Sequence, residues 1–231
     1  METKTKLLVK DREIVIPGEV LAEGMENLPG MGTYRQEDKI LSSQLGFVSI
    51  KERFVKVIPL TGKYNAYDND LVIGKVYDTT MNGWLVDVDS PYSALLPLRE
   101  VPEFIERGAD LTRYYDFGDV VVAKVFKVHR GKGIDLTMKG PGLRKISGGR
   151  LVKVTPSKVP RLIGKQGSMI SMIKEKTNCN IIVGQNGKVW IKGDNVDDEF
   201  KAVEAVLKVE NESHTDGLTD KIGLFLEGGK K

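Results

Sequence analysis

Two glycines interrupt an apolar, helix-like stretch, and this interruption constrains the fold more than any other part of the sequence. The stretch reads RLIGKQGSMI from Arg161 to Ile170, with Gly164 and Gly167 on either side of a lysine and a glutamine. A glycine inside a helix costs about 1 kcal/mol relative to alanine. The pattern therefore indicates two short helices joined by a tight loop, whose bare backbone suits the close approach of a phosphate chain.

The residues around this loop predict a complete order of elements: strand, helix, helix, strand, strand, helix. The run GRLVKVTP alternates as a strand does, and CNIIV and KVWI predict two more strands joined by a two-residue Asn186-Gly187 turn. Asn195, with Asp198 three residues later, predicts the start of the last helix. Its expected buried stripe consists of Phe200, Val203, Val206 and Leu207.

The positive charge of the chain is concentrated on this same segment. The whole chain has a net charge of only +3 at pH 7. Residues 150–193 nevertheless carry nine basic side chains and one acidic side chain, which is typical of a surface that binds a polyanion. A solvated basic face without a ligand has the same composition, so charge alone leaves both interpretations open.

The glycine loop and the order of elements together resemble the type I KH domain (βααββα). The resemblance implies that the G-x-x-G loop clamps about four nucleotides of a single strand. It also implies an apolar groove beside the loop, which receives the bases. The implied RNA-binding residues are Arg161, Ile163, Gly164, Lys165, Gln166, Gly167, Ile170 and Ile182.

Residues 69–140 predict five short strands separated by Asn-Gly, Ser-Pro and basic turns. The runs GWLVD, LLPL and LTMKG within them resemble the S-one-type OB barrel of a ribosomal protein. Such barrels bind single strands on one face, where bases stack on aromatic side chains beside basic ones. The candidate RNA-binding residues of this barrel are Trp84, Tyr92, Lys124, Lys127, Arg130 and Lys132.

Two features of the barrel region leave a structural role open. It carries nine basic and eleven acidic side chains, and Asn82 stands where the family often has an aromatic residue. On this alternative Trp84 belongs to the core and the barrel is mainly a spacer.

Residues 1–68 carry ten basic and ten acidic side chains and contain turn-rich strand segments. The runs IPGE and GMGTY in this region resemble the N-terminal β domain of the RNA-binding cap subunit of the archaeal exosome. Because the barrel and the KH pattern follow in the order of that family, the chain is identified as a member of it. The expected fold is multidomain and mainly β with an α+β part. It has an N-terminal β domain at 1–68, a five-stranded OB barrel at 69–140, and a KH domain with a C-terminal helical tail at 147–231.

This resemblance implies a non-catalytic RNA-binding subunit of the 3′-5′ RNA-degrading exosome, active in RNA degradation and processing. The family caps an RNase PH-like ring with three copies, docks through its N-terminal domain and guides single-stranded RNA to the pore. The expected partners are therefore single-stranded RNA and the ring subunits. A transcription elongation or antitermination factor that binds RNA, and a scaffold with little RNA contact, remain the alternatives.

The sequence contains no set of residues that would support catalysis. It lacks a GxxxxGK[ST] phosphate loop and a Ser-His or Cys-His arrangement at suitable spacing. Cys179 is the single cysteine and the two histidines lie far apart, so no cofactor or metal is expected. No apolar run approaches the roughly 18 residues of a membrane span, and no secretory signal is evident. We therefore expect a cytoplasmic protein that does not contact membranes.

Overall fold

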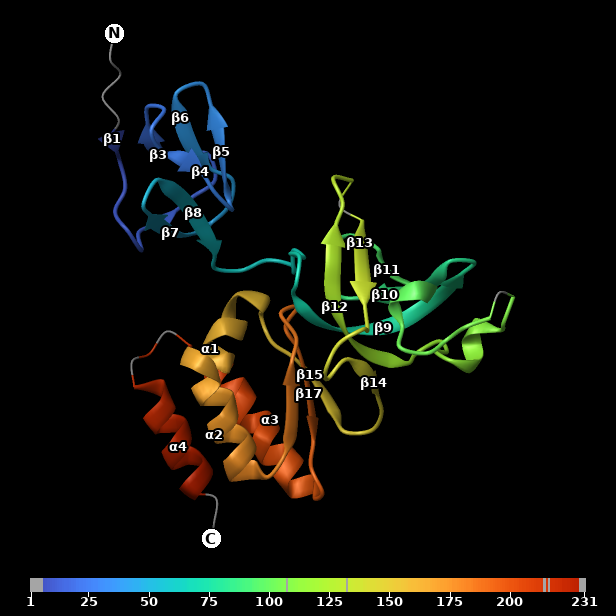
Figure 1. Cartoon of the computed structure of the whole chain (residues 1–231). Helices are drawn as coiled ribbons and strands as arrows, with labels where there is room; N and C mark the ends of the chain where they lie inside the picture. Colours follow the sequence, from blue (N-terminus) through green and yellow to red (C-terminus); the bar gives the residue numbers. More distant parts are fainter. Residues whose placement is uncertain (1–5, 107, 132, 214, 216, 229–231) are drawn as a thin grey trace. The chain divides into compact units, whose positions relative to one another are not determined.

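The computed structural model describes residues 6–106, 108–131, 133–213, 215 and 217–228. The chain divides into two compact units, Met1–Gly62 and Lys63–Lys231, and Figure 1 shows the elements of each. Within the described residues, no helix is both long enough and apolar enough to cross a membrane.

The first unit consists of two small four-stranded sheets that enclose one core. Alternating burial along the strands brings Val15, Leu21, Ile40, Val48 and Val57 together in this core. One sheet has the order β1 (Lys6–Leu7), β3 (Val20–Glu23), β6 (Lys39–Ser42), β5 (Thr33–Gln36). The other has the order β2 (Ile14–Val15), β7 (Gly46–Lys51), β8 (Phe54–Pro59), β4 (Leu28–Pro29).

The second unit begins with a closed barrel of five strands, as the sequence predicts. Its strands are β9 (Leu71–Thr80), β10 (Gly83–Asp87), β11 (Ala94–Pro97), β12 (Val120–Val128) and β13 (Ile134–Thr137). The barrel closes because β13 pairs with both β11 and β12. Two short 3-10 turns, Leu98–Glu100 and Leu111–Arg113, lie in the long connection from β11 to β12.

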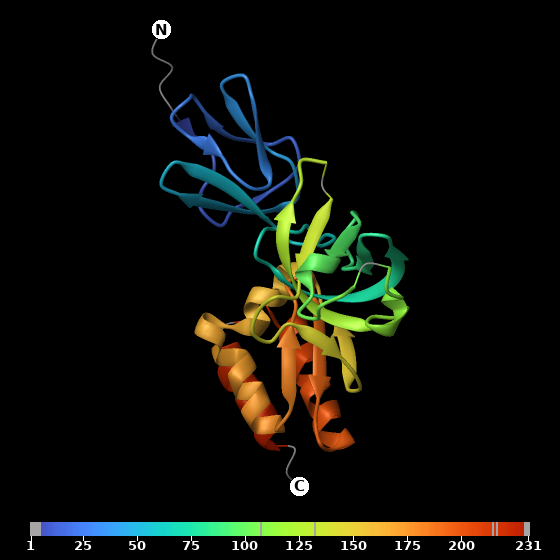
Figure 2. The same cartoon turned by 45° about the vertical axis from the view of Figure 1, so that its right-hand side comes forward.

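The rest of the second unit has the predicted βααββα order. It contains β15 (Arg150–Lys153), α1 (Val159–Ile163), α2 (Ser168–Thr177), β16 (Asn180–Val183), β17 (Lys188–Lys192) and α3 (Val196–Asn211). Short 3-10 turns at Pro156–Lys158 and Lys165–Gly167 precede α1 and α2. The strands form a sheet in the order β15-β17-β16, and the helices cover one of its faces (Figure 2).

The C-terminal segment forms a further helix, α4 (Leu218–Gly228), which folds back on the α+β part as expected. Leu218, Ile222 and Leu226 are its buried apolar residues and join the same core as α2 and α3. A hydrogen bond also joins this helix to α2, because the Nζ of Lys176 donates to the backbone oxygen of Gly223 at 3.1 Å.

The predicted buried stripe of α3 is largely wrong. Of its four expected members only Val206 is fully buried, whereas Phe200 and Leu207 are 49% and 38% exposed. The packed face is formed by Ala202, Ala205, Val206 and Val209. Small alanines allow the helix to lie close to its neighbours, and the Phe200 ring instead lies 4.0 Å below the guanidinium of Arg150.

A sixth strand, β14 (Arg144–Ile146), connects the barrel to the α+β part. It pairs antiparallel with β12, and the sequence did not indicate it. Ile146 lies in a small core with Ile73 and Val122 of the barrel and Trp190 of β17. The barrel and the KH-like part therefore pack against each other within one unit.

Candidate nucleic-acid interface

The two glycines of the GKQG loop are required for different structural reasons. Gly164 has φ +77°, and a Cβ there would lie 2.7 Å from the backbone nitrogen of Met169. Gly167 has φ +83°, but a Cβ there would have no neighbour within 4 Å. Gly164 is therefore required by close packing against the start of α2. Gly167 is required only by its backbone conformation, and the space beside it is open.

The loop presents the first turn of α2 without a side-chain cap. Gly167 occupies the cap position and makes no side-chain hydrogen bond to the first turn, whose N–H of Ser168 donates to the backbone oxygen of Lys165. Uncapped N–H groups and the positive end of the helix dipole favour an anion at such a position. Lys165 and Gln166 are exposed beside it, so the loop can accept a phosphate with backbone, cation and amide donors together.

The three predicted apolar residues of the groove lie around one hollow. Ile163 of α1, Ile170 of α2 and Ile182 of β16 all line a hollow of about 450 Å³. Each is half-buried, so each keeps apolar surface available to a ligand. Arg161 is exposed on α1 in the same helix-loop-helix segment.

The basic segment separates into structural cations and cations without an acidic partner. Arg150, Lys153, Lys176 and Lys188 form ion pairs with carboxylates, and Lys192 donates to the backbone oxygen of Ser147. Within the described residues, the other four cations have no carboxylate partner, and all lie in or before α1 and α2: Lys158, Arg161, Lys165 and Lys174. The positive charge available to a ligand is therefore concentrated beside the G-x-x-G loop.

Trp84 cannot stack on a base, so this part of the prediction for the barrel is wrong. Its side chain points into the barrel and is fully buried. The indole packs edge-on against Tyr115 with ring centroids 5.0 Å apart, and its N–H donates to the backbone oxygen of Leu111 at 3.3 Å. The alternative, that Trp84 is a core residue, is the one that the structure supports.

The other barrel candidates are spread over several elements. Tyr92 is 36% exposed in the connection from β10 to β11. Lys127 and Arg130 are exposed on β12 and in the following turn, and Lys124 is half-buried on β12. Lys132 lies outside the described residues.

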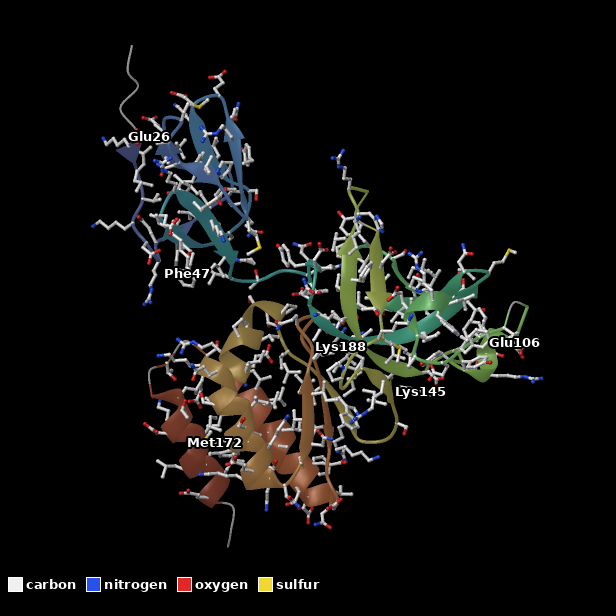
Figure 3. All side chains as sticks on the ribbon, viewed as in Figure 1. Glu26, Phe47, Glu106, Lys145, Met172 and Lys188 are labelled. Atoms are coloured by element: carbon white, nitrogen blue, oxygen red, sulfur yellow. The ribbon has the colours of Figure 1, made fainter. Side chains whose placement is uncertain are left out.

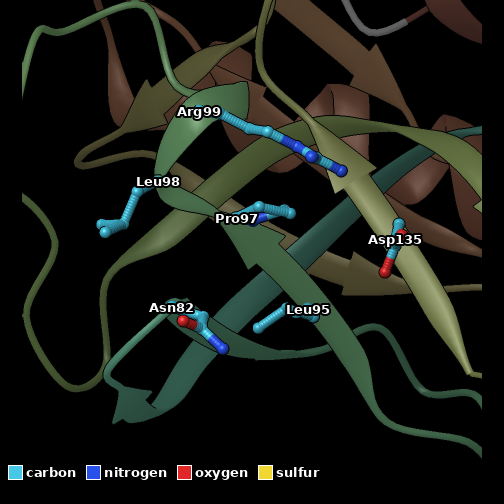
Figure 4. Close-up of a pocket in the computed structure, with 6 residues that line it drawn as sticks. All are labelled: Asn82, Leu95, Pro97, Leu98, Arg99 and Asp135. Atoms are coloured by element: carbon cyan, nitrogen blue, oxygen red, sulfur yellow. The ribbon is translucent and has the colours of Figure 1, made fainter.

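Of the candidates that the structure describes, none lines the hollow of about 380 Å³ that Figure 4 shows on the barrel surface. Its lining residues are Asn82, Leu95, Pro97, Leu98, Arg99 and Asp135. The lining contains no aromatic side chain, so it offers no stacking platform. Arg99 is its cation, and the sequence prediction missed it. Asp135 contacts His129, whose Nε2 lies 2.8 Å from the carboxylate.

Asn186 joins the KH-like part to the barrel, and its role was also missed. The predicted turn has a different register, because the N–H of Gly187 donates to the oxygen of Gly184, which places Asn186 inside the turn. The buried side-chain amide donates to the backbone oxygens of Ile73 at 2.8 Å and of Val88 at 3.0 Å. An Asn-Gly pair indicates a turn, but nothing local indicates what its amide binds.

Two lysines strengthen the same junction through one carboxylate. Lys188, labelled in Figure 3, is buried and lies 3.3 Å from Asp89, and Lys153 lies 2.7 Å from it. Burial raises the pKa of Asp89, but the two ammonium groups more than offset this effect. The net pKa therefore lies below its ordinary value of 3.8.

The grouping of metal-ligating side chains and the state of the thiol can be given for the part of the chain that the structure describes. Within the described residues, no three His, Cys, Asp or Glu side chains gather as metal ligands. Burial raises the pKa of the Cys179 thiol, which donates to the oxygen of Thr177 at 3.3 Å. A raised pKa disfavours the reactive thiolate.

The fold and the exposed glycine loop define a nucleic-acid-binding class of protein, with an OB-type barrel followed by a KH domain. A family model described as "KH domain" matches residues 149–197. A second, described as "Exosome RNA binding protein RRP4 N-terminal domain", matches residues 12–61.

Curated relatives extend the match over nearly the whole chain. Exosome complex component Rrp4 of Methanothermus fervidus is 47% identical over 95% of this chain and 97% of its own length. The Rrp4 of Thermococcus kodakarensis is 47% identical over 96% of this chain and 87% of its own length. The chain belongs to the Rrp4 family of exosome components. Membership of this family makes it a non-catalytic, RNA-binding component of the exosome.

A solved structure agrees with this assignment. It is described as an exosome complex RNA-binding protein and is 35% identical to this chain, with a TM-score of 0.65. The match covers 72% of this chain and 97% of that structure.

Proposed function

We propose that the chain captures single-stranded RNA in its KH groove and guides it into the exosome, as a cap on the RNase PH-like ring. The observation that carries this proposal is the uncapped start of α2 beside Lys165, with an apolar hollow next to it. Phosphates suit the helix terminus and the cation, and bases suit the half-buried isoleucines. The other free cations of α1 and α2 extend the attraction along the strand.

We further propose that the first unit, with the following residues to 68, docks on the ring, with three copies in the complex. The outer face of its second sheet carries an apolar row, in which Phe47 pairs in register with Ile14 on one side and Ile58 on the other. These residues are 38%, 56% and 47% exposed, respectively. Exposed apolar patches of this kind mark protein interfaces, which supports docking by protein contact rather than RNA contact.

The barrel, as residues 69–140, has the smaller role in this proposal. Tyr92, Lys127 and Arg130 remain its proposed RNA contacts, with Lys124 and Lys132. The buried Trp84 favours a barrel that mainly positions the KH domain, proposed as residues 147–231. The buried single cysteine is consistent with the cytoplasmic location that we propose.

The test of RNA binding uses the purified chain and a fluorescently labelled single-stranded RNA, incubated with magnesium and phosphate. We expect binding that weakens as salt rises, with log K falling by about 0.7 per phosphate contact per unit of log salt concentration. The RNA should keep its length. Absence of binding, or shortening that follows the pure protein through purification, would overturn the proposal.

The test of docking mixes the chain with a reconstituted RNase PH-like ring and follows the complex by size-exclusion chromatography. We expect Phe47→Asp to weaken the association, because docking would then bury a charge within the apolar row. Tyr34→Asp is the matched control, since Tyr34 is 42% exposed on the other sheet. Equal association of both variants with the ring would exclude this face.

A further inference from the structure

The hollow beside the GKQG loop is not formed by the KH-like part alone. Of the twelve described residues that line it, seven belong to α1, α2 and β16, and five come from the barrel strands and the segment that follows them. These five are Leu71, Val122, Pro141, Gly142 and Arg144. The groove therefore has a second wall, opposite the one that the sequence predicted.

Register explains why Arg144 faces the groove. Arg144 of β14 pairs with Val122 of β12, and directly paired residues of neighbouring strands share a face of the sheet. Val122 packs toward the KH-like part, in the small core with Trp190. Arg144 therefore points to the same side, and it lines the hollow with its side chain exposed.

Hydrogen bonds hold this wall in place. Leu71, which lines the hollow, accepts a bond of 2.7 Å from the backbone N–H of Gln185. The side-chain amide of Asn186 forms two hydrogen bonds with the backbone of Ile73, which follows on the same strand, β9. These three bonds join β9 to the turn between β16 and β17, so the barrel wall cannot move away from β16 without breaking them.

The charged groups of the hollow select an anionic ligand. Among the described residues that line it, Arg144 and Lys174 are charged and none is acidic. Within the part of the chain that the structure describes, neither cation forms an ion pair. An arginine also offers a planar fork of donors that binds phosphate bidentately or stacks on a base.

We propose that Arg144, which the barrel's last strand contributes, binds the RNA in the KH groove. The strand then lies between two walls, with the GKQG loop and α2 on one side and Arg144 on the other. This inference rests on the proposed function, and it adds a binding residue and makes the site depend on both domains. It also limits the width of the groove, which favours a single strand over a duplex.

The test compares Arg144→Ala with Lys145→Ala in the full chain. The two variants lose the same charge from neighbouring positions of one strand. Lys145 points to the other face and forms an ion pair with Asp119. Its loss therefore leaves a carboxylate without its partner, so this control makes the surface at least as unfavourable to an anion as Arg144→Ala does. Binding of a labelled hexanucleotide RNA is measured by fluorescence anisotropy at several salt concentrations.

We expect Arg144→Ala to weaken binding about fivefold to twentyfold, as loss of a charge-assisted contact does. The slope of log K against log salt should fall by about 0.7. Lys145→Ala should stay within about twofold of wild type, and Arg144→Lys should restore most of the slope. Thermal midpoints should be equal, because Arg144 is exposed.

The outcomes separate this inference from the proposed function. If the unmodified chain does not bind RNA, the proposed function fails and the inference fails with it. If the unmodified chain binds and Arg144→Ala binds equally well, or no worse than Lys145→Ala, the inference alone is overturned.

Discussion

The side-chain amide of Asn186 forms two hydrogen bonds with the backbone of Ile73, a residue 113 positions earlier in the chain. Its Nδ2 donates to the oxygen of Ile73 at 2.8 Å, and the N–H of Ile73 donates to its Oδ1 at 3.3 Å. A third bond reaches the oxygen of Val88. One side chain thus satisfies three backbone groups of the barrel from a turn of the KH-like part. This contact sets the position of the barrel wall of the groove.

Replacement of Asn186 by alanine should destabilise the second unit by about 2–3 kcal/mol, because it leaves buried backbone groups without partners. For a domain of this size, this corresponds to a fall in the melting temperature of roughly 5–10 °C. Gln185→Ala is the matched control, since only the backbone N–H of Gln185 takes part in the junction. Calorimetry of both variants measures the difference. Equal melting temperatures would contradict the structural role of Asn186.

At acidic pH, the free energy of unfolding should depend on the protonation of Asp89. A carboxyl whose folded pKa lies below its unfolded value contributes stability that is present above the unfolded pKa. That contribution disappears as pH falls through the folded pKa. The pKa of Asp89 lies below 3.8, so its contribution is complete at pH 7 and is lost below about pH 4.

Denaturant unfolding of wild type and Asp89→Asn at several pH values checks this expectation. Asparagine is suitable because Asp89 has φ +60°, a conformation that asparagine tolerates. The difference in unfolding free energy should be largest near neutral pH and should shrink toward pH 3. A difference that stays constant with pH would show that the two lysines do not act on this carboxyl.

The order of elements in the KH-like part could be predicted because it rests on local features. Alternating residues mark the strands, and the GKQG loop separates two helices that the structure places at Val159–Ile163 and Ser168–Thr177. The prediction of the buried face of α3 is wrong because it assigns the large apolar residues to that face. Ala202 and Ala205 form that face instead, since close helix packing favours small residues.

The loop half of the candidate site could also be predicted, but the barrel half could not. Arg144 belongs to a three-residue strand, RKI, that is too short to show a period. Its position opposite Val122 depends on a pairing between distant segments. The contact between Asn186 and Ile73 is of the same kind. Local periodicity has no information on such pairs.

Trp84→Ala should act on stability and not directly on RNA binding. Loss of a buried tryptophan costs about 3–5 kcal/mol, whereas Phe126→Ala, at a side chain 56% exposed on the same barrel, should cost far less. Chemical denaturation gives both values. RNA affinity measured under conditions where the Trp84 variant is folded should equal that of wild type. A large loss of RNA affinity in a folded Trp84→Ala protein would instead show that Trp84 contributes to RNA binding.

The GKQG loop is tested by the double change Lys165→Asp with Gln166→Asp. Both side chains are exposed, so stability should change by no more than about 0.5 kcal/mol. RNA affinity should fall at least tenfold at low salt, because two carboxylates would face the phosphates that the start of α2 attracts. Glycine substitutions are less informative, since Gly164 and Gly167 both have positive φ and any side chain there adds strain.

A control with the same change of net charge separates local contact from the overall charge of the chain. Lys221→Asp with Asn211→Asp alters two exposed residues of α4 and α3 that do not line the hollow. This control should weaken binding by less than about threefold, and the effect should vanish as salt screens it. If the loop variant binds RNA as tightly as the control at every salt concentration, with equal thermal midpoints, then the loop does not contact phosphates.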